Sequence, residues 1–113
     1  MMVDKELPAC PVAITVGLIG NKWKILILRD VMTGPKRFGE LLKSLEGISQ
    51  KVLTDNLRSM EADGLLTRTV FPEVPPHVEY GLSELGESMR PIIRQLELWG
   101  ESYRQKIRQI RRA

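Results

Sequence analysis

Cys10 is the single cysteine of the 113-residue chain, and Pro11 follows it directly. Proline suits the first position of a helix, so we expect the thiol to lie near the positive end of a helix dipole. That position favours the thiolate, the form of cysteine that reacts with oxidants and electrophiles. A lone cysteine cannot close a disulfide within one subunit, so oxidation would join two subunits, attach a small thiol or stop at the sulfenic acid. The alternative is a small packed cysteine without a signalling role.

His77 is the single histidine, so the sequence has no histidine cluster, and it has no cysteine pair with the spacing of a zinc site. Neither the GxGxxG fingerprint nor a P-loop is present. A nucleophile pair of Cys10 and His77 is conceivable, but no surrounding motif supports it. We therefore expect neither an enzyme nor a cofactor or metal.

Polar side chains gather on one side of a predicted helix over 49–63, which Ser49 caps and Gly64 ends. At about 100° per residue, the apolar side chains of this helix share one side and most of the polar ones face away from it. The polar positions are Ser49, Gln50, Lys51, Thr54, Asp55 and Arg58. Glutamine can read adenine, lysine can bind guanine or a phosphate, and an aspartate can accept from the cytosine amino group. The pattern predicts a helix that contacts double-stranded DNA.

The elements around this helix are short and separated by turn residues. Apolar residues at helical spacing predict helices over 11–20, 22–33 and 38–45. β-Branched and alternating residues predict a β-hairpin over 66–82, and a capped helix follows over 84–112, which Pro91 should kink. Helices followed by a hairpin and a long helix are typical of a winged helix-turn-helix, a fold that is mainly α with a small β-hairpin (α+β).

Further cations lie outside the 49–63 helix. Lys36 and Arg37 precede the 38–45 helix, where we expect them to anchor phosphates, which positions a protein on DNA without reading its sequence. Arg68 and His77 of the hairpin are candidates for the minor groove, although histidine is neutral for much of the time near pH 7. The alternative for these residues is a solvated basic surface.

The composition is that of an ordinary globular protein, with 42% hydrophobic and 27% charged residues. Its 17 basic and 14 acidic residues give a net charge of +3, which permits a polyanionic partner without requiring one. The longest uncharged stretch, 7–21, is too short and too interrupted by proline and glycine to span a bilayer. We therefore expect a cytoplasmic protein with no membrane partner.

Several ordered pieces of the sequence carry a family resemblance. They are GPKRF at 34–38, ISQKVLT at 48–54, EADGL at 61–65, and VEY at 78–80 followed by LG at 85–86. Through these pieces and Cys10-Pro11, the chain resembles the HxlR-type family of bacterial winged-helix transcription regulators, relatives of the MarR group. The resemblance implies a homodimer that binds double-stranded DNA and often responds to oxidants or electrophiles, with Cys10 as the sensor.

The residue pattern and the resemblance together give one prediction for the whole chain. We expect a single winged helix-turn-helix domain over 1–113, with a DNA-binding core at 22–82 that includes the wing at 66–82. The helices at 11–20 and 84–112 would form the homodimer interface, because one small domain cannot cover so long an apolar stripe unless the stripe folds back onto it. Such a dimer would present two recognition helices about 34 Å apart to a pseudo-palindromic operator, and repression by occupancy is the simplest outcome. The alternative function is that of a winged-helix protein–protein interaction module that binds no DNA.

Overall fold

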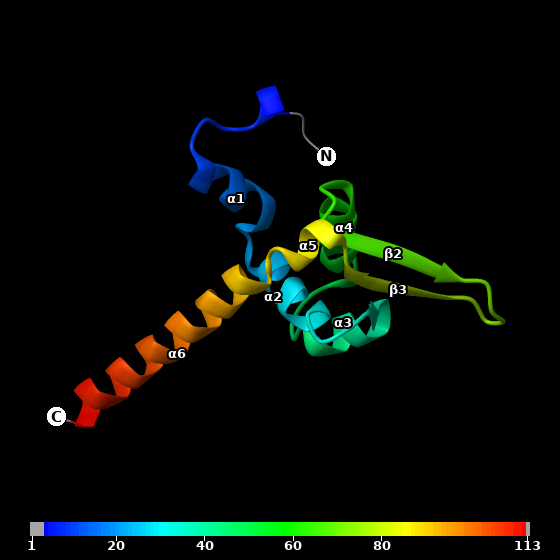
Figure 1. Ribbon diagram of the computed structural model, residues 1–113. Helices are drawn as coiled ribbons and strands as arrows, with labels where there is room; N and C mark the ends of the chain where they lie inside the picture. Colours follow the sequence, from blue (N-terminus) through cyan, green and yellow to red (C-terminus); the bar gives the residue numbers. More distant parts are fainter. Residues whose placement is uncertain (1–3, 113) are drawn as a thin grey trace.

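The computed structural model describes residues 4–112 of the chain. Figure 1 shows a central group of helices from which a hairpin extends on one side and a long helix on the other. In chain order the elements are η1 (Asp4–Glu6), α1 (Pro11–Ile19), α2 (Lys22–Val31), β1 (Lys36–Arg37), α3 (Phe38–Ser44), α4 (Gln50–Ala62), β2 (Leu66–Phe71), β3 (His77–Leu82), α5 (Glu84–Glu87) and α6 (Arg90–Arg112). This order is that of a winged helix-turn-helix, which confirms the predicted fold class.

The core forms where α2, α3 and α4 meet. Ile27 and Leu28 of α2 and Leu53 of α4 have no exposed surface. α2 is apolar on most sides because it contacts α3, α4, β3 and α6. On α4 the buried residues follow helical spacing, so this helix has one face for the core and one for solvent.

Side-chain caps set the starts of three helices, among them the predicted cap at Ser49. The side chains of Asn21, Ser49 and Ser83 each accept a hydrogen bond from a backbone N–H three residues further on. α4 ends just before Gly64, whose φ of 80° lies in the left-handed region that favours glycine. The chain therefore turns directly from α4 into the first strand of the wing.

β3 is the central strand of an antiparallel sheet with the order β1-β3-β2. β2 and β3 form the predicted hairpin, paired from Leu66–Leu82 to Phe71–His77. β1, in which Lys36 pairs with Tyr80 and Arg37 with Glu79, was not predicted from the sequence. A strand of two residues is too short to show the alternation by which strands are recognised in a sequence.

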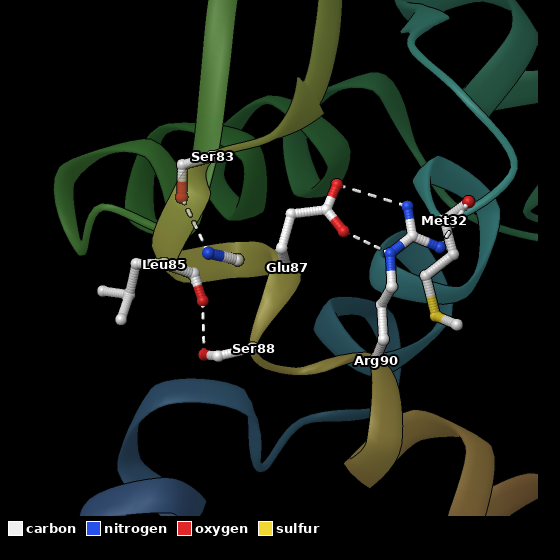
Figure 2. A network of polar contacts seen from close by, with 7 residues as sticks. Met32, Ser83, Leu85, Glu87, Ser88 and Arg90 are labelled. Atoms are coloured by element: carbon white, nitrogen blue, oxygen red, sulfur yellow. Dashed lines mark hydrogen bonds and ion pairs between the residues drawn. The ribbon is translucent and has the colours of Figure 1, made fainter.

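The structure divides the helix predicted over 84–112 into α5 and α6, with the break beside Pro91, where a kink was expected. Pro91 accounts for the break, since a proline without an N–H fits the first turn of a helix and not its interior. Arg90 bridges the break (Figure 2): its Nη1 donates to the Met32 carbonyl oxygen at 2.8 Å, and its other nitrogens bind the Glu87 carboxylate. The start of α6 is thereby attached to the end of α2.

α6 extends away from the core and gives the molecule its elongated dimensions of 59 × 39 × 24 Å (Figure 1). Large apolar side chains along α6 are exposed, namely Ile92, Leu96, Leu98, Trp99, Tyr103 and Ile110. Val12 and Val16 of α1 are exposed as well. Among residues 4–112, no single helix is long and apolar enough to cross a membrane. α1 and α2 together have the required length and composition, but the pair is bent by 78°.

Candidate nucleic-acid interface

The outer face of α4 carries the polar residues that the sequence analysis selected there. Gln50, Lys51, Asp55 and Arg58 are exposed and Thr54 is half-buried, while Leu53, Asn56, Leu57 and Met60 form the buried face. The helix therefore presents a polar surface, formed by these five residues, that is largely open to solvent. Such a surface has the size and shape to enter a major groove.

Two of the polar groups at the start of α4 have partners within the same helix. The Lys51 ammonium lies 2.8 Å from the Asp55 carboxylate, in an ion pair that is largely solvated. The Ser49 hydroxyl accepts from the backbone N–H of Val52 at 3.1 Å and so caps the helix. A solvated ion pair contributes little to stability and is readily exchanged for another partner, whereas a cap holds its hydroxyl in place.

A polar depression of about 340 Å³ lies between α4 and the wing. It is lined by Phe38, Thr54, Arg58, Glu61, Arg68 and Tyr80. The fold thus brings together Thr54 and Arg58 of α4 and Arg68 of β2, three residues that the sequence analysis had selected separately. Among residues 4–112, neither arginine makes an ion pair, whereas the α6 arginines Arg94 and Arg104 each bind a glutamate of the same helix.

Strand register decides which wing residues reach this depression. Arg68 and Tyr80 pair directly across β2 and β3, so their side chains lie on the same face of the sheet. His77 is an odd number of residues from Tyr80 along β3, so it lies on the opposite face. The sheet therefore separates Arg68 from His77, the two wing residues that were selected together as candidates for the minor groove.

His77 has local partners on its own face of the wing. Its Nδ1 lies 3.0 Å from Glu73 and its Nε2 3.0 Å from Glu79, and the ring stacks on Phe71 with 4.5 Å between centroids. Both ring nitrogens are therefore occupied by carboxylates. Glu73 and Glu79 lie at different nitrogens of the His77 ring. Within the described residues, no cluster of three or more His, Cys, Asp or Glu side chains could hold a metal ion.

Lys36 and Arg37 lie at the root of the wing, in β1. Lys36 lines a separate depression between α2 and α3, together with Arg29, Asp30 and Glu40. Arg37 is exposed, and its backbone N–H donates to the Glu40 carboxylate at the start of α3. Neither cation lines the depression that holds Arg58 and Arg68.

Cys10 is an exposed free cysteine at the N-cap position of α1. Its side chain makes no capping hydrogen bond, and Pro11 occupies the first turn as predicted. The exposed apolar side chains of Val12 and Val16 follow on the same helix. The thiol is accessible, and it lies at the end of a helix that has apolar surface of its own.

Residues 18–108 match the profile of the HxlR-like helix-turn-helix family. The chain belongs to this family. HxlR-like proteins are transcription regulators, and the chain is accordingly a helix-turn-helix transcription regulator. The Bacillus subtilis (strain 168) regulator YdeP, itself uncharacterised, is 42% identical over 102 residues, which cover 90% of this chain and 80% of YdeP.

Solved structures with the same fold include other regulators related to this HxlR-like chain. The redox regulator HypR in its reduced form has a TM-score of 0.83 and 42% identity, covering 88% of this chain and 99% of its own. HypR in its oxidised form has a TM-score of 0.80 and 45% identity, covering 82% and 96%. A putative MarR-family regulator from Enterococcus faecalis V583 has a TM-score of 0.78 and 40% identity, covering 96% of each chain.

Three residues that line the depression of this HxlR-like regulator were not selected from the sequence: Phe38, Glu61 and Tyr80. Tyr80 occupies an alternating position of the predicted hairpin, and that alternation is the signal that could have placed it beside Arg68. Glu61 lies three residues after Arg58 on α4, so helical spacing is the signal that could have placed it beside Arg58. Phe38 has no such signal, because its neighbours in the depression come from other elements.

Proposed function

We propose that this HxlR-like regulator binds double-stranded DNA as a sequence-specific homodimer and acts as a repressor. The observation that carries the proposal is the depression between α4 and the wing, which Arg58 and Arg68 line together with Glu61, while neither arginine makes an ion pair among residues 4–112. Unpaired arginines on an exposed face match the phosphate backbone, which supplies much of the affinity of DNA-binding proteins. This function requires no catalytic group or cofactor, and it places the protein in the cytoplasm with the DNA that it regulates.

In this proposal α4 enters the major groove with its first turns foremost. Gln50 would read adenine, Lys51 would leave Asp55 to bind guanine or a phosphate, and Asp55 would then accept from cytosine. Thr54 would contact a base edge or methyl group further along the helix. Ser49 would act through its cap, which leaves the adjacent backbone N–H groups of α4 facing a phosphate.

The remaining cations would hold the DNA backbone. Arg58 and Arg68 would share the phosphates that pass between α4 and the wing, and Lys36 and Arg37 would anchor the neighbouring strand. His77 would approach the minor groove only weakly, because Glu73 and Glu79 occupy both of its ring nitrogens.

The homodimer would form through α1 and α6. An exposed run of apolar and aromatic side chains over most of α6 is larger than a soluble monomer usually leaves in water, and Trp99 and Tyr103 stack within it. Two copies related by a two-fold axis would bury both stripes and bring their α4 helices to successive major grooves, about 34 Å apart. A pseudo-palindromic operator follows from that symmetry.

Cys10 would sense oxidants or electrophiles. A peroxide would take two electrons from the thiolate, giving the sulfenic acid while the peroxide leaves as water or an alcohol; a quinone would instead add its carbon to sulfur. The exposed position of Cys10 beside the apolar face of α1 supports this role, as does the similarity to HypR, a redox regulator solved in both oxidation states.

The decisive experiment is selection of bound duplexes from a random library, followed by titration of the selected duplex and of a scrambled one. We expect a selected sequence with two inverted half-sites and at least a thousandfold preference over the scrambled duplex at physiological salt. A protein that binds both duplexes equally, or neither at low salt, is not the regulator proposed here. For the sensor role, Cys10→Ser should keep its DNA affinity in the presence of a quinone or peroxide that weakens wild-type binding; equal responses of the two proteins would exclude Cys10.

A further inference from the structure

A pair of amides, exposed Asn21 and buried Asn56, joins the start of α2 to the middle of α4. Asn21 Nδ2 donates to Asn56 Oδ1 at 3.0 Å, and Asn56 Nδ2 donates to the Val52 carbonyl oxygen at 2.8 Å. Asn56 is 9% exposed, and within the described part of the chain it is the only polar residue buried in the core. It lies on the same face of α4 as Leu53 and Leu57, where an apolar side chain would serve packing alone. A buried polar group at such a position needs a specific partner, and Asn21 supplies it.

Asn21 uses both ends of its amide. Its Oδ1 accepts from the Lys24 N–H at 2.8 Å and caps α2, while its Nδ2 makes the bond to Asn56. One turn further along, Lys24 Nζ donates to Ser59 Oγ at 3.0 Å and adds a second polar contact between the same two helices. The beginning of α2 is therefore attached to α4 at two consecutive turns.

The junction between α1 and α2 is short and specific for glycine. Gly20 alone separates the α1 C-terminus from Asn21, and its N–H donates to the Val16 carbonyl oxygen at 2.7 Å. A Cβ atom at Gly20 would lie 2.2 Å from that oxygen, so no other residue fits without displacing the backbone. The two helices meet at a bend of 78°, and the chain leads directly from α1 through Gly20 to Asn21, whose side chain contacts Asn56 on α4.

We propose that Asn21 and Asn56 are positioning residues, whose hydrogen bond sets the orientation of α4 relative to α1. The proposal deepens the proposed DNA-binding function and rests on it, because a dimer joined through α1 can present two α4 helices at a defined spacing only if each α4 is fixed relative to its own α1. Without the bond, α4 samples further orientations, and affinity falls in proportion to the fraction of molecules in the orientation that binds.

Asn21→Ser separates this role from helix capping. Serine is a good N-cap and keeps the bond to the Lys24 N–H, but it is too short to reach Asn56. Ser44→Ala is the matched control, because it also removes one hydrogen bond between helices, from Ser44 Oγ to Asp30 at 2.7 Å, without involving α4. Asn56→Leu removes the partner of Asn21. The double variant, which carries both Asn21→Ser and Asn56→Leu, completes a double-mutant cycle.

Two measurements test the proposal. The first is the spin-label distance distribution between Cys10 and a second cysteine at Glu61→Cys, an exposed position on α4, with labelled subunits diluted into unlabelled protein. We expect a narrow distribution in the otherwise unchanged protein and in Ser44→Ala, and a broadened one in Asn21→Ser. The second is affinity for the selected duplex, without labels, at a temperature where every variant is folded. We expect a loss of about fivefold in Asn21→Ser and in Asn56→Leu, no further loss in the double variant, and none in Ser44→Ala.

An unchanged distribution or an unchanged affinity in Asn21→Ser overturns the positioning role, as does a loss of the same size in Ser44→Ala. The distance measurement needs no DNA. If the unaltered protein binds no duplex, the proposed function fails, and the distance distributions still decide whether the two asparagines hold α4 in place.

Discussion

The strongest quantitative prediction concerns Arg68, the wing residue that faces α4. Arg68→Gln removes the positive charge while keeping a polar side chain of similar reach. Because Arg68 makes no ion pair among residues 4–112, its charge is available to DNA without first breaking one. We expect the variant to bind the selected duplex more weakly at low salt and to approach wild-type affinity as the salt concentration rises.

The expected size follows from counting charges. Each phosphate that a cation neutralises contributes about 0.9 to the slope of log K against log [salt] on duplex DNA. One Arg68 in each subunit of a dimer makes two contacts, so the slope should become shallower by about 1.8. Arg58→Gln should lower the slope by a similar amount if Arg58 binds a phosphate, and the double variant should lower it by about twice as much.

The assay is fluorescence anisotropy with the selected duplex at salt concentrations from about 50 to 300 mM, a range in which such slopes are readily measured. Arg94→Gln is the control, because this arginine is also exposed but is paired with Glu97 on the face of α6 opposite the apolar stripe. We expect its slope to equal that of the unaltered protein. A slope for Arg68→Gln equal to that of Arg94→Gln would refute the assignment of the depression to the DNA backbone.

Three further predictions concern other parts of the molecule. Asp55→Asn releases Lys51 from its ion pair and removes an acid from the DNA-facing side of α4, so binding of scrambled duplex should tighten; unchanged binding in anisotropy titrations would contradict this. Trp99→Asp places a charge in the apolar stripe of α6 and should shift a dimer toward monomer in sedimentation velocity, whereas an unchanged sedimentation coefficient would place the dimer contact elsewhere. The hydrogen bond from Arg90 lowers the pKa of Glu87 below its ordinary value of 4.5, so the stabilisation from this pair is complete above that pH and lost as the pH falls through the lowered pKa. In a carbon-13 NMR titration, Arg90→Gln should return the pKa of Glu87 to its ordinary value, and an unmoved titration would show that Arg90 is not the cause.

The helices and the hairpin could be predicted because their signals are local. Ser49 and Gly64 bound α4 through capping and a left-handed turn, which depend on neighbouring residues only. The polar face of α4 follows from helical periodicity in the same way. The candidate residues on α4 could therefore be selected without knowledge of the rest of the structure.

The relations between elements could not be predicted in this way. β1 exists only because Lys36 and Arg37 find β3 far along the chain, and a two-residue strand leaves no pattern. The separation of His77 from Arg68 depends on strand register, which sequence alternation does not fix across two strands. The bond between Asn21 and Asn56 joins residues that each have an adequate local explanation, a cap and a polar position within a helix.

The break between α5 and α6, which Arg90 bridges, is the point about which α6 would pivot as a lever arm. α6 contains 23 residues, and at about 1.5 Å per residue it reaches about 34 Å from the Met32 carbonyl that the arginine holds. A tilt of only about 5° at this joint would carry the far tip sideways by about 3 Å, close to the rise of one base pair along a duplex. A small change of angle at this joint is therefore amplified along the whole length of α6.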